Sequence, residues 1–199
     1  MKVYIFCDME GVSGISADAY VSFEQNRPDL MAVGRKFMAA DINACVEGCF
    51  LGGAKTVVVR DGHGGGLNVT RNLIDARADL VSGPTLGVRF GAFENTDAMI
   101  LLGYHAMAGT KNALLEHTYS SFTIQNLWLN GKQAGEIGID AAIAAEYSVP
   151  VIMVSGDDKA CEEAADSIPG VVTCQVKTSL SLNGALLPSL DKTQKLITD

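Results

Sequence analysis

Short, continuous runs of apolar residues recur along the chain, and segments with helical character separate them. Residues 3–6 read Val-Tyr-Ile-Phe, residues 57–59 are all valine, and residues 99–102 read Met-Ile-Leu-Leu. Runs without polar alternation are typical of strands that are buried on both faces, as in a parallel sheet covered by helices. Because parallel strands need crossovers between them, the pattern predicts an α/β fold with a mostly parallel sheet flanked by helices.

The predicted elements form a single domain spanning residues 1–199, a length that is sufficient to bury one core. The predicted strands are residues 2–7, 55–60, 78–81, 97–103, 149–154 and 171–177, and the predicted helices are residues 28–51, 136–147, 159–167 and 191–197. Pro28 suits the first turn of its helix. Asn130-Gly131 favours a tight turn, so residues 122–129 and 132–134 are predicted to form an inserted β-hairpin.

The charge balance is acidic, with 23 Asp and Glu residues against 15 Lys and Arg residues and a net charge of −8. Nucleic-acid binding needs clustered basic residues, so we expect no nucleic-acid partner. No apolar stretch approaches the length of a membrane span, so we expect no membrane partner either. The five cysteines are an odd number without a Cys-x-x-Cys pair, which favours free thiols in a cytoplasmic protein.

Carboxylate and imidazole side chains lie at the ends of several predicted strands. Asp8 and Glu10 follow the first strand, His63 follows the second, and His105 follows a later one. Glu136 begins the helix after the hairpin. The carboxyl ends of parallel strands meet at one edge of the sheet, where ligands of open α/β folds bind. We therefore expect these residues to lie close together.

These residue types are the ones that hold transition metals. Zinc and related ions take imidazole and carboxylate ligands, and two adjacent metals need a carboxylate that bridges them. Asp8, Glu10, His63, His105 and Glu136 supply five such groups. Because side chains two residues apart in a strand point the same way, Asp8 and Glu10 would reach one centre. The sequence thus predicts a site for two divalent metal ions in a hydrolase.

Structural roles for the same residues stay open at this point. The two acids after the first strand also fit a solvated loop or a helix cap, and the two histidines also fit hydrogen-bonded structural positions. Glu136 also fits the positive end of its helix. Asp157 and Asp158 follow a strand as well, but we predict that they cap the next helix rather than bind metal.

Six short segments, in order along nearly all of the chain, carry a resemblance to a known family. They are Cys7-Asp8-Met9-Glu10-Gly11, Asp61-Gly62-His63, Gly103-Tyr104-His105-Ala106, His117, Gly135-Glu136-Ile137-Gly138 and Val154-Ser155-Gly156-Asp157-Asp158. In these segments the chain resembles the D-aminopeptidase family of bacterial zinc peptidases. The resemblance implies a co-catalytic centre of two zinc ions. Asp8 would bridge the ions, with Glu10 and His105 on one of them and His63 and Glu136 on the other.

The resemblance also implies a catalytic residue, a substrate and an assembly. His117 would be the catalytic residue, which the family assigns as a nucleophile, although a histidine near a metal-bound water also suits a proton shuttle. Family members cleave short peptides with D-configured N-terminal residues, so the expected function is that of a dinuclear zinc-dependent aminopeptidase. They form stacked five-membered rings, which implies a homo-oligomer, a decamer of two pentameric rings. Relatives continue for a further C-terminal segment, which this chain, ending at Asp199, is expected to lack.

Three other functions are consistent with parts of the sequence. A dinuclear-metal phosphoesterase or another amidohydrolase would use the same ligands, but the arginines nearest to the glycine-rich loop 62–66 are only Arg60, Arg71 and Arg77. A nucleotide or anion-binding module would use that loop, which lacks the usual phosphate-binding patterns. A cysteine hydrolase would use Cys7, whose acidic neighbours would raise the pKa of its thiol.

Overall fold

Seven strands form the central sheet of the computed structural model, which describes residues 1–199 except for the side chain of Phe23. The strand order is β3-β2-β1-β4-β7-β8-β9. Their bounds are β1 Lys2–Cys7, β2 Thr56–Asp61, β3 Asp79–Val81, β4 Ala98–Tyr104, β7 Val151–Asp157, β8 Val172–Ser181 and β9 Gly184–Leu186. All neighbouring pairs from β3 to β8 are parallel, and β9 alone joins the sheet antiparallel. The predicted fold class is confirmed.

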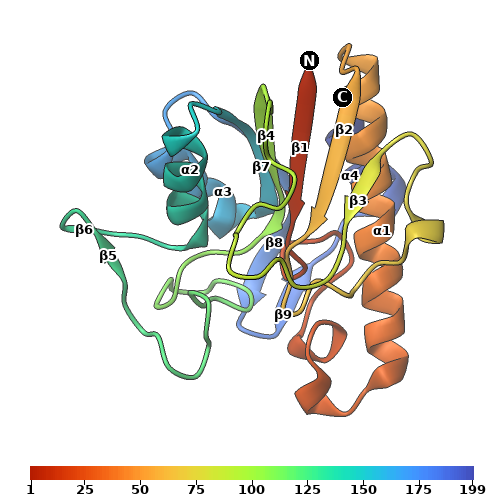
Figure 1. The fold of residues 1–199 in the computed structure, drawn as a ribbon. Helices are drawn as coiled ribbons and strands as arrows, with labels where there is room; N and C mark the ends of the chain where they lie inside the picture. Colours follow the sequence, from red (N-terminus) through yellow and green to blue (C-terminus); the bar gives the residue numbers. More distant parts are fainter.

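Four α-helices cover the two faces of this sheet (Figure 1). They are α1 Pro28–Leu51, α2 Glu136–Glu146, α3 Asp158–Ser167 and α4 Leu190–Thr198, and short 3₁₀ turns occupy η1 Asp18–Tyr20, η2 Phe23–Gln25 and η3 Arg71–Leu73. Helices α1 and α4 lie on one face, and α2 and α3 lie on the other. Within the described chain, no helix combines the length and the apolar character that crossing a membrane requires.

The helix ends follow the expected capping chemistry. Pro28 occupies the start of α1, where its missing N–H costs no helical hydrogen bond. The Asp157 carboxylate accepts a hydrogen bond of 2.7 Å from the Ala160 N–H at the start of α3. The prediction of capping is confirmed for Asp157, whereas Asp158 is the first residue of the helix and its carboxylate accepts a 2.7 Å hydrogen bond from the Ser179 N–H instead.

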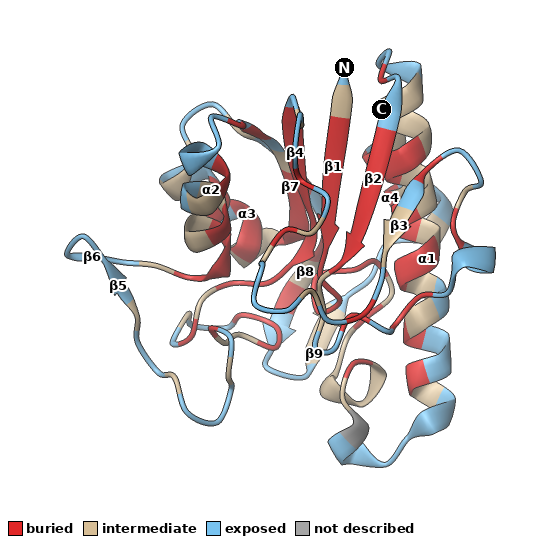
Figure 2. Cartoon of the chain, in the orientation of Figure 1, coloured by how far each residue is buried: buried red, intermediate tan, exposed pale blue. Residues whose placement is uncertain are grey.

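The central strands are buried along most of their length (Figure 2). Apolar side chains pack on both of their faces, which explains why their sequences show no polar alternation. Ile5 and Val59 belong to the core cluster that includes Ile42 of α1. Phe6 and Leu101 belong to the other cluster, on the side of α2 and α3. The sheet is thus held between two layers of packed side chains, and its strand ends are fixed in position.

The sheet has a topological switch point between β1 and β4. From β1 the chain proceeds to β2 and β3 on one side, whereas β4, β7 and β8 build the sheet outward on the other. In open α/β sheets, ligands bind outside the carboxyl ends of the strands at such a point. The loops after β1 and β4 therefore border the crevice where a site is expected.

Two glycines allow these two loops to approach each other closely. The Gly11 N–H donates a 2.8 Å hydrogen bond to the carbonyl of Gly103, which adopts φ +71° at a bulge in β4. A Cβ on Gly11 would lie 1.9 Å from the Tyr104 carbonyl oxygen, a distance that no side chain can adopt. The glycine of the Asp-x-Glu-Gly sequence is therefore required by backbone contact.

The predicted β-hairpin is much shorter than expected. Only β5 Trp128–Leu129 and β6 Lys132–Gln133 pair around the turn, and residues 122–127 form no strand. Both β5 residues are exposed and, among the described residues, no third strand joins the hairpin, so little favours extending the ladder. The antiparallel hairpin of β8 and β9 was not predicted, although Asn183-Gly184 is a hairpin turn dipeptide.

Candidate metal centre

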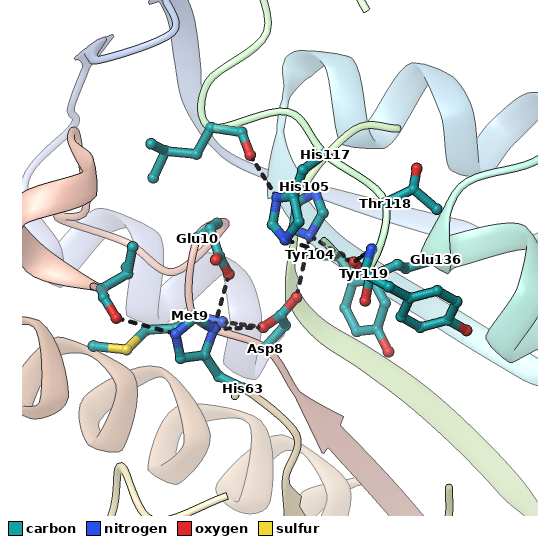
Figure 3. A network of polar contacts seen from close by, with 12 residues as sticks. Asp8, Met9, Glu10, His63, Tyr104, His105, His117, Thr118, Tyr119 and Glu136 are labelled. Atoms are coloured by element: carbon teal, nitrogen blue, oxygen red, sulfur yellow. Dashed lines mark hydrogen bonds and ion pairs between the residues drawn. The ribbon is translucent and has the colours of Figure 1, made fainter. Parts of the chain in front are cut away.

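The loops that follow three adjacent strands bring their polar side chains to one place. Asp8 follows β1, His63 follows β2 and His105 follows β4 (Figure 3). Asp8 lies between the two histidines: its Oδ1 is 3.1 Å from His63 Nδ1, and its Oδ2 is 3.4 Å from His105 Nε2. All three side chains are wholly or largely withdrawn from solvent. The prediction that these strand ends meet is confirmed.

The remaining predicted residues join this centre as two groups. Glu10 Oε2 lies 3.2 Å from His63 Nδ1. Glu136 Oε1 lies 3.4 Å from His105 Nε2 and 3.7 Å from His117 Nε2. The donor atoms of Asp8, Glu10 and His63 all lie within 4.8 Å of one another, and so do those of His105, His117 and Glu136. This grouping differs from the one that the resemblance implies, which places Glu10 with His105 and His63 with Glu136.

The three histidines share one hydrogen-bonding arrangement. His63 Nε2 lies 3.1 Å from the Val21 carbonyl, His105 Nδ1 lies 3.0 Å from its neighbour's carbonyl, and His117 Nδ1 lies 2.9 Å from a carbonyl two residues back. Because a carbonyl only accepts, the ring nitrogen at each contact must carry the hydrogen. The opposite nitrogen of each ring faces carboxylate oxygen atoms. Metal-binding histidines are oriented in this way.

The electrostatics of the centre favour positive charge. Burial raises the pKa of the Asp8 carboxyl, but hydrogen bonds and charges from His105 and His63 outweigh it and hold that pKa well below its usual range. Burial lowers the pKa values of His63 and His105, yet Glu10, Asp8 and Glu136 raise both well above the usual value for histidine. The carboxylates thus create a buried position that a cation would occupy favourably.

Two buried atoms show that the residues fit a bound metal ion. Glu10 Oε2 and His105 Nε2 are inaccessible to water, and their polar contacts are imidazole–carboxylate ion pairs, at 3.2 Å from Glu10 to His63 and at 3.4 Å from His105 to Asp8 and Glu136. These contacts are longer than well-formed charge-assisted hydrogen bonds, and buried polar atoms are usually satisfied more fully than this. Imidazole nitrogen and carboxylate oxygen are the donors that zinc prefers. The donor set and its long ion-pair contacts therefore suit a divalent transition metal.

A network behind Glu136 fixes its carboxylate, and the sequence did not reveal it. The Tyr119 N–H donates to Glu136 Oε1 at 2.8 Å, and Arg89 Nη2 lies 3.5 Å from Glu136 Oε2. Arg89 is in turn held by two hydrogen bonds, of 2.8 and 2.7 Å, from its guanidinium to Asp140, which also accepts 2.6 Å from the Tyr104 hydroxyl. Asp140 lies one helical turn after Glu136 on α2, a spacing that could have identified it.

Other candidate residues from the sequence have structural roles. The Asp61 carboxylate accepts hydrogen bonds from the Asn68 and Val69 N–H groups and so closes the loop that carries His63. The Cys7 sulfur is fully buried and lies 3.2 Å from the Asp8 carbonyl oxygen, and burial, followed by nearby carboxylates, raises the pKa of its thiol. This placement does not suit a nucleophile, and the raised pKa agrees with the effect predicted from its acidic neighbours.

A cleft of about 760 Å³ opens beside the centre. Glu10, His63 and His117 line it on the side of the centre. Its other walls contain the acidic side chains of Asp18, Glu24 and Glu116 together with the apolar side chains of Leu115, Phe122 and Leu182. A cleft of this size accommodates a small organic ligand, and its acidic side chains favour a ligand that carries a positive charge.

The fold and the centre together define a metal-dependent hydrolase. Residues 1–199 match the sequence profile of the M55 peptidase family, D-aminopeptidase. The chain is 34% identical over 203 residues to a D-aminopeptidase from Bacillus subtilis (strain 168), covering 100% of this chain and 72% of the relative. The chain belongs to this D-aminopeptidase family, and the predicted metal-dependent aminopeptidase is confirmed at that level.

A solved structure supports the same assignment. The fold matches, with a TM-score of 0.90 and 34% identity, a protein described as "Zn-dependent D-aminopeptidase DppA from Bacillus subtilis, a self-compartmentalizing protease". The match covers 100% of this chain and 71% of that one. Membership of a peptidase family favours a peptidase over the phosphoesterase and nucleotide-binding alternatives. Arg89, which lies 3.5 Å from Glu136, is also engaged by Asp140 and so is not free to hold a phosphate.

Proposed function

We propose that this protein hydrolyses the N-terminal peptide bond of short peptides, with D-configured N-terminal residues, at a centre of two zinc ions. One observation carries the proposal: His63, His105 and His117 each donate one ring N–H to a backbone carbonyl and direct the other nitrogen toward carboxylates. The zinc dependence and D-aminopeptidase activity of the relatives support it.

Asp8 is the proposed bridging ligand, because its two oxygen atoms lie near different histidines. Glu10, His63, His105 and Glu136 would complete the two sites. When bound, the ions polarise the scissile carbonyl and lower the pKa of the attacking water. The short distances from Glu10 to His63 and from Glu136 to His105 favour these two pairs over the crossed arrangement that the family resemblance implies.

His117 is the proposed catalytic residue. Its ring lines the cleft, and its Nε2 has the lone pair because Nδ1 donates to the Leu115 carbonyl. Nε2 can accept a proton at the centre and return it to the leaving amine, a role that general acid–base catalysis requires. A nucleophilic role for the same nitrogen is the alternative, and a covalent intermediate would distinguish it.

The acidic cleft supplies a reason for specificity toward a free N-terminus. Asp18, Glu24 and Glu116 line it, so their negative charges attract the ammonium group of an unblocked peptide. N-acetylated peptides would lack this charge. We therefore expect the enzyme to act on unblocked dipeptides and tripeptides and to discriminate against acetylated ones.

The active form is proposed to be a homo-oligomer, a decamer of two stacked pentameric rings. The proposal follows the resemblance to the family and the description of DppA as self-compartmentalizing. Light scattering of the purified protein after size-exclusion chromatography measures its mass directly. A monomeric mass at assay concentration, together with full activity, would contradict this part of the proposal.

Metal analysis combined with a peptide assay tests the function. The purified chain is expected to contain about two zinc ions per chain and to hydrolyse D-Ala-D-Ala faster than L-Ala-L-Ala. A chelator should abolish activity, and added zinc should restore it. A phosphoester substrate serves as the control and should remain intact. Undiminished peptidase activity in chelator, with far less than one metal per chain, would rule out the proposal.

A further inference from the structure

A fully buried lysine lies beneath the loop that carries Asp8 and Glu10. Lys177 belongs to β8, far from that loop in sequence, and is only 1% exposed. Its ammonium donates hydrogen bonds to three backbone carbonyls, those of Glu10 at 2.6 Å, Val12 at 2.9 Å and Ile15 at 2.8 Å. A lysine ammonium has three donors, so these contacts use all of them.

The loop needs this cation for an electrostatic reason. Residues 8–15 form turns rather than a helix or strand, and three of their carbonyl oxygen atoms converge on one point. The negative ends of carbonyl dipoles repel each other in a buried setting unless a positive charge lies between them. An apolar side chain in place of Lys177 would remove the donor that the Glu10 and Ile15 carbonyls share and would leave the Val12 carbonyl with only its 3.2 Å bond from the Ile15 N–H, a costly arrangement in the interior.

Two further contacts hold the same loop on its other sides. The Ser13 N–H donates 2.7 Å to the buried Asp41 carboxylate of α1. The Gly11 N–H donates to Gly103 at the bulge of β4. Glu10 is thus the residue whose carbonyl is fixed by Lys177 while its side chain reaches His63. A shift of its backbone would move its carboxylate directly.

We propose that Lys177 is a positioning residue for the metal centre. Its ammonium fixes the loop of residues 8–15 so that the carboxylates of Asp8 and Glu10 already converge on their histidines before a metal ion binds. The inference rests on the proposed function, because it assigns Lys177 a role toward the metal that Asp8 and Glu10 would hold. It predicts that Lys177 controls metal affinity and ligand geometry beyond any effect on folding.

Cobalt binding to the metal-free chain provides a readout that does not depend on catalysis. Co²⁺ accepts the same imidazole and carboxylate ligands, and its visible absorption reports their geometry. Lys177→Met removes the charge at similar length, Lys177→Gln keeps two donors, and Lys177→Arg keeps the charge. We expect Lys177→Met to weaken Co²⁺ binding by about 10- to 100-fold and to alter the absorption, as loss of an outer contact does elsewhere. Lys177→Arg should recover much of both signals.

Arg71 offers a control because its side chain, although exposed, also donates to three loop carbonyls elsewhere. Its guanidinium donates to the carbonyls of Ile74 at 2.7 Å, Asp75 at 2.5 Å and Ala78 at 2.6 Å, in a loop that carries no residue of the centre. Arg71→Met should lower thermal stability while leaving Co²⁺ affinity and absorption unchanged. The comparison of the two variants distinguishes two effects. One is the general loss of a cationic side chain that binds loop carbonyls, and the other is the specific loss of Lys177 beneath the loop of residues 8–15.

The possible outcomes discriminate between the two proposals. If the unmodified chain binds no Co²⁺, the proposed function fails. If it binds Co²⁺ and folded Lys177→Met binds with the same affinity and absorption, only the role of Lys177 is wrong. If Lys177→Met does not fold, Lys177→Gln is judged by the same two signals. Failure of both variants to fold would make Lys177 a general structural residue and would also overturn the inference.

Discussion

The imidazole rings of His105 and His117 stack face to face, with centroids 3.9 Å apart and planes inclined by 11°. The stack directs both Nε2 atoms toward the same oxygen of Glu136, at 3.4 and 3.7 Å. Two histidines separated by a loop therefore contact one carboxylate oxygen. His105 is buried, whereas His117 is partly exposed and lines the cleft. The difference in exposure suggests a division of roles between metal binding and proton transfer.

Replacement of each histidine tests that division. His117→Gln should lower kcat by about 10²- to 10⁴-fold, the range for loss of a general acid or base, while metal content stays at the wild-type level. His105→Gln should lower the metal content itself. Elemental analysis and steady-state kinetics on the same preparations measure both effects. Loss of metal from His117→Gln would show that this histidine is a ligand instead.

Asp140→Asn should lower the metal affinity of the centre without changing any of its proposed ligands. Asp140 holds Arg89 and the Tyr104 hydroxyl behind Glu136, and an amide cannot accept both guanidinium hydrogen bonds. Metal affinity is expected to fall by about 10- to 100-fold. Asp166→Asn, which changes an exposed carboxylate paired with Lys132, is the control. Equal affinities in the two variants would exclude a role for Asp140.

Asp41 should make folding stability depend on pH. Burial raises the pKa of its carboxyl to about 6, against opposing effects of the Ser13 hydrogen bonds and the Lys177 charge. Because the folded pKa exceeds the usual aspartate pKa of 3.8, this group favours the folded state most at acidic pH. Its contribution is lost as the pH rises through about 6.

Asp41→Asn should remove this dependence. Relative to wild type, the free energy of unfolding of the variant should increase between pH 4 and pH 7, by up to about 3 kcal/mol for a shift of this size. Urea unfolding at several pH values measures the difference, and the asparagine oxygen can still accept from Ser13. A constant difference across this pH range would show that Asp41 does not titrate as described.

Gly11→Ala should damage both the fold and the centre. The added methyl group would meet the Tyr104 carbonyl and force β1 and β4 apart, which we expect to cost at least about 2 kcal/mol. Gly65→Ala in the His63 loop is the control, because a Cβ there meets nothing within 4 Å. Thermal melts and metal titrations of the pair give the comparison. Equal melting temperatures would disprove the close contact.

Much of the fold was predictable because the information is local. Continuous apolar runs indicate buried strands, and strand ends in a parallel sheet meet at one edge, so Asp8, His63 and His105 could be grouped from sequence alone. The predicted length of the β-hairpin was wrong because it depends on information that is not local. Its turn signal was correct, but the length of a ladder depends on packing partners that sequence periodicity does not reveal.

The residues that hold the ligands of the centre in place could not be predicted from the sequence, for a similar reason. Arg89 lies in an irregular loop and Lys177 lies in β8, and each reaches the centre only through long-range packing. A lysine within a strand reads as a solvent-facing residue, since lysine is rarely buried. Asp140 is the exception, because its spacing from Glu136 on one helix places both on the same face.

The pairing of β1 with both of its neighbours has a consequence for how the molecule reaches its native state. The Asp8 N–H is bonded to the Leu102 carbonyl directly after β1, so the carboxylate takes its place only when the strand is aligned correctly. A slip of one residue would present Cys7 or Met9 instead and reverse every side chain of the strand. A ligand that binds Asp8 therefore stabilises only correctly aligned molecules, and metal binding would act as a selection for the proper alignment during folding.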